Sequence, residues 1–333
     1  MWPTRLALAL VFVLLVTAPF LVSEYYVEIL IVLLINTLLA SSYRLVTTTG
    51  DWSLCHVVLM GAGAYATALI AKLLGWNFWV SLPLAGLAAA VVGLSVVYPL
   101  LRTKGFGFFI GSFAVGEFVR LTWVKFHNPF GGPRGMIGIP TPELGTIDFF
   151  FATPYYFLTL IVVLLSLWIL FRIDRAPLVG DVMKAIYMDE ELAQSVGVDV
   201  SRYRAIAFMT GAFFAGIAGV LLAHRLGAID PHNFDINTMV YLVIWVVVGG
   251  TKTFWGPIIG VVVMTFIFEW SRPLLEWRPL LFGGILIFFL IFMPGGLESL
   301  GTKARSWWSA RQSRSPADTP GGTPRPAPSE PGE

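Results

Sequence analysis

The chain has 333 residues, of which 56% are hydrophobic and 13% are charged, and its formal net charge is +2. Ordinary soluble domains carry about 25% charged residues, and so few charges cannot cover the surface of a compact globule of this size. The composition therefore predicts a membrane protein. The near-neutral charge excludes a nucleic-acid-binding protein held by a broad basic surface. The single cysteine, Cys55, excludes an intrachain disulfide framework.

Apolar runs that could cross a bilayer core of about 30 Å recur along the chain. They predict an all-α polytopic membrane protein of about ten transmembrane helices, which together form a transmembrane domain over residues 1–300. Pro19 follows a candidate signal-peptidase site in the first run, so we interpret that run as an uncleaved helix. The runs are residues 6–23, 25–43, 55–74, 78–101, 105–124, 155–171, 205–223, 237–250, 254–270 and 279–293.

The distribution of Lys and Arg predicts the orientation of the chain. Most of the 22 basic residues fall on the side of both termini if the N-terminus is cytoplasmic, and basic residues favour the cytoplasmic side of short loops. Residues 172–204 then form a central cytoplasmic loop, and the Gly- and Pro-rich residues 127–154 form an outer loop without helix or strand. The Pro-, Gly- and Ser-rich residues 301–333 are expected to be a disordered cytoplasmic tail.

The central loop contains a pattern of helix outside the bilayer. Between residues 182 and 196 apolar side chains recur at steps of three and four, which places them on one helical face. Asp189 falls within this apolar stripe, which predicts a break and a second short helix capped by Asp189. Gly197 follows the last apolar position and can supply the left-handed residue that ends this second helix.

The charge of the polar face indicates what the loop contacts. That face is largely acidic and includes Glu190 and Glu191. Amphipathic helices that rest on a membrane usually present basic polar faces, and anionic lipid would repel an acidic one. The pattern therefore favours contact with a protein partner over a helix resting on the membrane surface.

A series of short motifs follows in a fixed order. One is the acidic pair Glu190 and Glu191, followed by Ala193 and Gly197. The others are residues 53–65 (SLCHVVLMGAGAY), 101–105 with 113–117, 131–140 (GGPRGMIGIP), 212–219 (AFFAGIAG), 248–250 with 255–260, and 292–297. Taken together, these motifs resemble the permease subunits of branched-chain amino-acid ABC transporters of the LivM type, over about residues 30–298.

The resemblance implies an importer permease of the prokaryotic inner membrane, driven by ATP that separate subunits hydrolyse. The implied partners are a second permease subunit, two cytoplasmic ATPase subunits, a periplasmic or lipid-anchored substrate-binding protein and membrane lipid. The resemblance also implies that Glu190, Glu191, Ala193 and Gly197 couple the permease to the ATPase. The chain itself has no Gly-x-x-x-x-Gly-Lys-Ser/Thr motif, and we expect no cofactor and no catalysis in it.

Departures from the family motifs leave the cargo open. Cys55 stands where the family usually has Gly, and Lys252 and Arg134 stand at positions that are commonly small, polar or acidic. The resemblance implies branched-chain amino acids, and urea or short amides are the alternative cargo for the same importer class. An ion-gradient-driven secondary transporter and a membrane-embedded enzyme are the alternative classes. No substrate-binding residues are assigned from the sequence.

Glu117 and Arg120 lie three residues apart within an apolar run and therefore on one helical face. Charges at that depth cost several kcal/mol unless they are paired or hydrated. We interpret them as a structural ion pair, with a proton relay or a substrate contact as the alternative. A secondary transporter usually needs more carboxylates near the membrane centre, so Glu117 alone gives it little support.

Small residues recur at helical spacing in three runs. In lipid such stripes mark helices that approach each other closely, so we predict helix contacts there that a bulky substitution would block. The residues are Gly107, Gly111, Gly211, Ala215, Gly219, Gly256 and Gly260. None of the four histidines has a second ligand at metal spacing, so no metal site is predicted. His56 is expected to bond a backbone carbonyl near a helix start.

Overall fold

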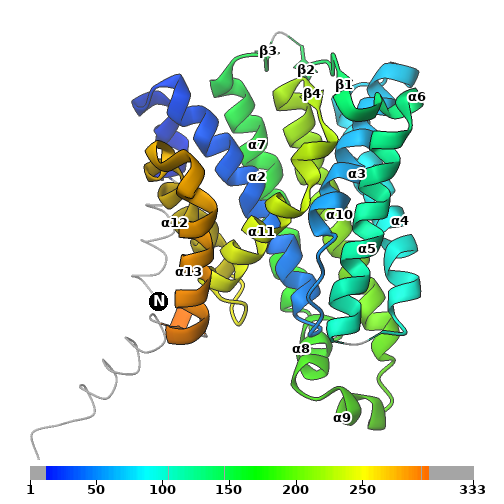
Figure 1. Ribbon diagram of the computed structural model, residues 1–333. Coiled ribbons are helices and arrows are strands. Elements are labelled where there is room, and N and C mark those ends of the chain that lie inside the picture. Colours follow the sequence, from blue (N-terminus) through cyan, green and yellow to red (C-terminus); the bar gives the residue numbers. More distant parts are fainter. Residues whose placement is uncertain (1–12, 104, 146, 294, 300–333) are drawn as a thin grey trace, which may run out of the picture.

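The computed structural model describes residues 13–103, 105–145, 147–293 and 295–299 as a bundle of long helices (Figure 1). Six of the helices in this part of the chain are long and apolar enough to cross a membrane. They are α2 (Glu24–Thr47), α3 (His56–Leu69) with its continuation η1 (Ile70–Leu74), α4 (Phe78–Leu100), α5 (Phe106–Lys125), α7 (Ala152–Asp174) and α10 (Val200–Leu226).

Three further apolar helices are shorter: α11 (Ile236–Gly249), α12 (Gly256–Trp270) and α13 (Arg278–Phe292). They contain 14, 15 and 15 residues, which at 1.5 Å per residue gives about 21–23 Å, less than the bilayer core of about 30 Å. Each predicted run from residue 25 onwards thus corresponds to a helix, but the count of about ten full-length spans is not confirmed. The first run lies partly outside the described residues, and its residues 13–21 are helical.

α10 lies at the centre of the bundle and packs against α2, α3 and α4. Small residues allow this close approach. A Cβ added to Gly219 would lie 1.9 Å from the carbonyl oxygen of Met60 in α3, and one on Gly211 would lie 2.9 Å from Cγ2 of Val46 in α2. Ala215, between them, is fully buried. The backbones of these helices therefore touch where the sequence places its small residues.

The end of the bundle opposite α8 (Gly180–Met188) carries short irregular elements (Figure 1). They include α6 (His127–Phe130), η2 (Gly132–Arg134) and two ladders of two-residue strands. The sequence predicts an irregular loop without helix or strand over residues 127–154, and that prediction is wrong. β1 (Met136–Ile137) pairs antiparallel with β4 (Ala228–Ile229), and β2 (Glu143–Leu144) pairs with β3 (Ile147–Asp148). The first ladder joins segments far apart in the chain, so local sequence gives no signal for it. Helix still predominates, as expected for the all-α class.

Two more elements complete the described structure. η3 (Pro231–Phe234) leads from β4 into α11, and η4 (Arg272–Trp277) joins α12 to α13. The predicted tail, residues 301–333, lies outside the described residues, as does the start of the predicted membrane domain, residues 1–12.

Candidate functional site

Two short helices project from one end of the bundle (Figure 1): α8 and α9 (Glu190–Ser195). The predicted break between them is confirmed, because Asp189 has an extended backbone and its carboxylate accepts a hydrogen bond of 2.9 Å from the Leu192 amide. Gly197, which follows α9, has a φ of +89° and confirms the expected left-handed end. We call α8, α9 and the residues up to Gly197 the α8–α9 hairpin.

One face of the hairpin packs on the bundle, and the other is open. Ile186 and Ala193 are buried together with Val200 at the start of α10. Leu192 and Val196, which share the predicted apolar stripe, are instead 62% and 74% exposed. Four large apolar side chains therefore lie uncovered at this end of the molecule: Tyr187, Met188, Leu192 and Val196. A surface of this kind, outside the apolar spans, is typical of a contact site for another protein.

A buried ion-pair cluster ties α9 to the bundle. The Arg204 guanidinium in α10 lies 3.1 Å from a Glu190 carboxylate oxygen and 2.9 Å from a carboxylate oxygen of Asp51, in the connection between α2 and α3. Asp51 is only 5% exposed. Burial raises the pKa of its carboxyl to about 6, although the Arg204 charge opposes this rise. Glu190 thus faces the bundle, whereas Glu191 is exposed.

A second cluster ties α8 to the bundle. Asp174, at the end of α7, forms an ion pair of 2.9 Å with Arg44 of α2 and one of 3.7 Å with Lys184 of α8. The Lys184 ammonium also donates a hydrogen bond of 2.7 Å to the Asp174 carbonyl. Arg44 donates in turn to the Thr251 carbonyl, in the connection between α11 and α12. These contacts link α8 to α2, α7 and this connection.

Sequence reasoning missed both clusters. It placed Glu190, Glu191, Ala193 and Gly197 in the hairpin, and the structure puts these four residues in one compact element. It did not select Arg204, Asp51 or Asp174, because their partners are brought together by helix packing rather than by spacing in the chain. The only local signal was the position of Asp51, a charged residue in a short connection at the predicted inner face.

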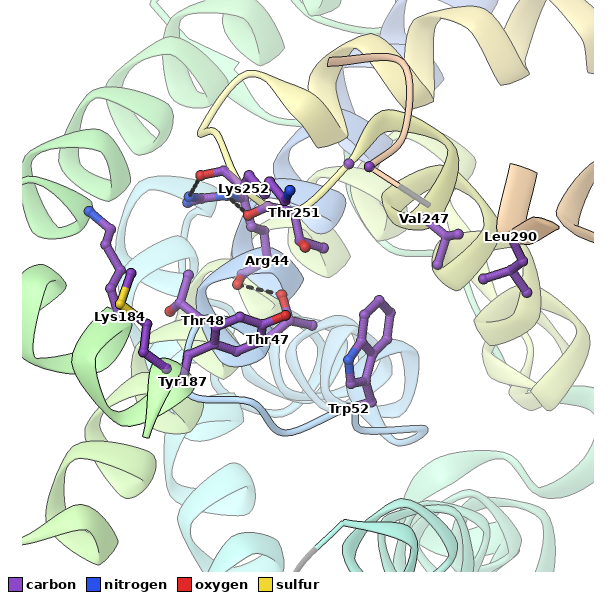
Figure 2. A pocket seen from close by; sticks show the side chains of 13 residues that line it. Arg44, Thr47, Thr48, Trp52, Lys184, Tyr187, Val247, Thr251, Lys252 and Leu290 are labelled. Carbon is purple, nitrogen blue, oxygen red and sulfur yellow. Dashed lines mark hydrogen bonds between the residues drawn. The ribbon is translucent and has the colours of Figure 1, made fainter. Parts of the chain in front are cut away.

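A cavity of about 490 Å³ lies beside the hairpin. Figure 2 shows it between the end of α2, α8 and the connection that follows α11. Its lining residues are Arg44, Thr47, Thr48, Trp52, Lys184, Tyr187, Met188, Val247, Gly250, Thr251, Lys252, Leu290 and Gly295. They combine apolar walls with three cations, and the set contains no carboxylate.

The predicted intramembrane pair lies on α5. The Arg120 Nε donates a hydrogen bond of 2.9 Å to Glu117, and the two side chains are 14% and 30% exposed. The geometry is that of the structural ion pair expected from the sequence. α5 is also the long helix with the fewest buried residues, namely Phe108, Ser112, Gly116 and Trp123.

The remaining small residues differ in their surroundings. A Cβ on Gly256 would lie 2.2 Å from the Gly250 carbonyl oxygen, and one on Gly260 would lie 1.9 Å from that of Trp245 in α11. On Gly111 it would lie 2.6 Å from Leu100 of α4. Gly107 is different, because among the described residues a Cβ there would meet only Thr103, at 3.6 Å. No helix of the described chain therefore packs on Gly107.

His56 begins α3, as expected, but its predicted bond to a backbone carbonyl is wrong. Its Nε2 instead lies 2.9 Å from the Ser42 hydroxyl, which the packing of α2 against α3 brings beside the start of α3. Within the described ranges, no three His, Cys, Asp or Glu side chains gather in a group that could hold a metal ion.

The fold defines a multi-pass membrane protein with a helical hairpin outside its apolar spans. Comparison with known proteins places it further: residues 25–293 match the family described as "Branched-chain amino acid transport system / permease component", and the chain belongs to this family. It is therefore a permease subunit, as the motifs suggested.

Individual relatives agree with this assignment. The chain is 31% identical over 317 residues to the high-affinity branched-chain amino acid transport system permease protein LivM of Salmonella typhimurium, and equally to that of Escherichia coli K12. Each alignment covers 88% of this chain and 74% of the relative. The permease protein LivH of Escherichia coli K12 is 29% identical over 137 residues, 40% of this chain and 43% of LivH. No solved structure gives a significant match.

Proposed function

We propose that this chain is the membrane-spanning permease subunit of an ABC importer for branched-chain amino acids, driven by ATP that separate subunits hydrolyse. The observation that carries the proposal is the α8–α9 hairpin. It presents Tyr187, Met188, Leu192 and Val196 to solvent and is tied to the spans by two ion-pair clusters. Family membership supplies the cargo class, since the LivM relatives carry that class in their names.

The hairpin acts as the contact for the two cytoplasmic ATPase subunits of the importer. Glu190, Ala193 and Gly197 maintain its shape, and the exposed Glu191 is available to a partner. When the ATPases close, they move the hairpin. The Arg204 and Asp174 clusters then transmit this movement to α10, to α7 and to the connections that follow α2 and α11.

The second permease subunit covers the face that carries α5. Glu117 and Arg120 are partly exposed on this poorly buried helix. Charged side chains facing lipid cost several kcal/mol, so a protein surface with polar groups is the better neighbour. Gly107, which no helix of the described chain contacts, lies on the same helix and allows close approach of that partner.

The proposed topology places both termini and the hairpin in the cytoplasm of a prokaryote and the chain in its inner membrane. α11, α12 and α13 insert as well, in addition to the six long spans and the first apolar run, so that ten segments enter the membrane. The opposite end, with the β1–β4 ladder, faces the periplasmic or lipid-anchored substrate-binding protein.

The test is transport by the assembled complex in proteoliposomes. We expect leucine uptake that requires both ATP and the substrate-binding protein. In Gly197→Val, ATP hydrolysis should continue without leucine uptake, because a β-branched residue is strained at a φ of +89°. Gly75→Val is the matched control, because Gly75 also has a positive φ and open space around it but lies between α3 and α4.

Three results would contradict the proposal. Uptake driven by a pH or sodium gradient with this chain alone would indicate a secondary transporter. ATP-driven uptake of urea but not of leucine would show that the importer carries urea instead of branched-chain amino acids. Normal coupling of leucine uptake to ATP hydrolysis in Gly197→Val would show that the hairpin does not couple the permease to the ATPases.

A further inference from the structure

The cavity beside the hairpin has a size and lining suited to a small amphipathic solute. Its volume of about 490 Å³ lies within the range of about 300–1,000 Å³ that is typical of ligand pockets. Trp52, Val247, Leu290 and Met188 provide apolar walls. An apolar solute side chain would be removed from water there, which is favourable in proportion to the area buried.

The cations of the cavity are not equally available to a ligand. Arg44 is held by Asp174 and by the Thr251 carbonyl. Lys184 is held by the same carboxylate, and Figure 2 shows its side chain directed away from Trp52, Val247 and Leu290. Lys252 is exposed, and its ammonium forms no ion pair within the part of the chain that the structure describes.

The backbone around Lys252 is held in place independently of its side chain. Glu298 accepts hydrogen bonds of 2.7 Å from the Lys252 amide and 2.9 Å from the Thr253 amide. The carboxylate of Glu298 is thereby occupied by backbone donors. Lys252 thus extends from a fixed backbone beside a cavity whose lining contains no carboxylate, a place suited to an anionic group.

The cavity also offers acceptors for an amino group. The Thr47 and Thr48 hydroxyls donate their hydrogens to the helix carbonyls of Arg44 and Leu45. Their oxygen lone pairs remain available to accept hydrogen bonds. A cation, hydroxyl acceptors and apolar walls match the carboxylate, ammonium and aliphatic side chain of an apolar amino acid. They do not match urea, which has no apolar part and no charge.

We propose that this cavity is a binding site for a small apolar amino acid at the hairpin end of the permease, with Lys252 holding its carboxylate. The proposal rests on the proposed function for the direction of transport, but the cavity itself is defined by the chain. Tyr187 and Met188, which form part of its wall, belong to the hairpin. Movement of the hairpin therefore changes the site, which links release of the cargo to the ATPase cycle.

The test is direct binding to the assembled transporter in nanodiscs without the substrate-binding protein, measured by saturation-transfer NMR. The probes are leucine, isovalerate, which keeps the carboxylate, and 3-methylbutylamine, which lacks it. We expect signals for leucine and isovalerate but not for the amine. Lys252→Met should weaken leucine binding about tenfold or more, as for loss of a charge-assisted hydrogen bond. Val247→Trp should abolish it by filling the cavity.

Lys72→Met is the matched control, because Lys72 is exposed in η1, away from the cavity. The transporter with Lys72→Met should bind leucine as the wild type does. Equal leucine binding in the wild type, Lys252→Met and Val247→Trp would overturn the proposal. So would equal binding of the amine. If leucine gives no signal while native mass spectrometry shows phosphatidylglycerol retained by the wild type but lost in Lys252→Met, the cavity is a lipid site and the proposal is wrong.

Leucine uptake separates this inference from the proposed function. Normal ATP-driven uptake without leucine binding in the cavity would overturn only the inference. ATP-driven uptake of another solute without uptake of leucine would instead overturn the proposed function, because the cargo would then not be a branched-chain amino acid.

Discussion

The contact between α10 and α3 allows a quantitative test of close helix packing. A Cβ on Gly219 would lie 1.9 Å from the Met60 carbonyl oxygen, whereas ordinary van der Waals contact begins at 3.4 Å. Gly219→Ala therefore forces the two helices apart by about 1.5 Å, the difference between these distances, or bends one of them. Overpacking of this kind costs about 1–3 kcal/mol and occasionally more. The gain of about 1 kcal/mol in helix propensity on replacing glycine with alanine offsets only part of this cost.

Gly107→Ala is the matched control, since it makes the same substitution in a helix at a position where only Thr103 is near. We expect thermal unfolding of the detergent-solubilised chain to occur several degrees lower in Gly219→Ala than in the wild type. Gly107→Ala should unfold at the wild-type temperature or above. Gly219→Leu should reach the membrane but abolish transport. Equal unfolding temperatures for the two alanine variants, or normal uptake by Gly219→Leu, would refute the reasoning.

Two further predictions concern the ion-pair clusters. The pKa of Asp51 is raised to about 6 in the folded protein, so acidification through that pH protonates its carboxyl. Because the folded state then binds this proton more tightly than the unfolded state, protonation of Asp51 raises the stability of the fold. The attraction of Asp51 to Arg204 is lost at the same time. We expect ATP-coupled uptake by the wild type to fall as the pH on the hairpin side is lowered from 7 to 5, and to depend less on pH in Asp51→Asn. The same pH profile in the wild type and in Asp51→Asn would contradict this prediction. Asp174→Asn leaves the buried Arg44 without its counter-charge and should destabilise the chain by about 3 kcal/mol in denaturation experiments. Asp181→Asn, at a 63% exposed side chain, should have little effect, and equal losses would contradict the assignment.

Local chemistry in the sequence determined much of the fold. The apolar runs predict the helices because a segment in lipid must satisfy its own backbone hydrogen bonds. The break at Asp189 and the left-handed Gly197 follow from capping preferences that act within a few residues. Glu117 and Arg120 were recognisable as a pair because helical geometry alone places residues three apart on one face.

Tertiary structure alone decided which distant residues meet. Arg204 reaches Asp51 and Glu190 because α10, the α2–α3 connection and α9 converge, and Asp174 meets Arg44 across 130 residues. No spacing in the chain encodes such contacts, since they depend on how helices pack. The cavity arises in the same way, because its walls come from four separate parts of the chain. Sequence thus determined the hairpin, and helix packing decided what the hairpin is connected to.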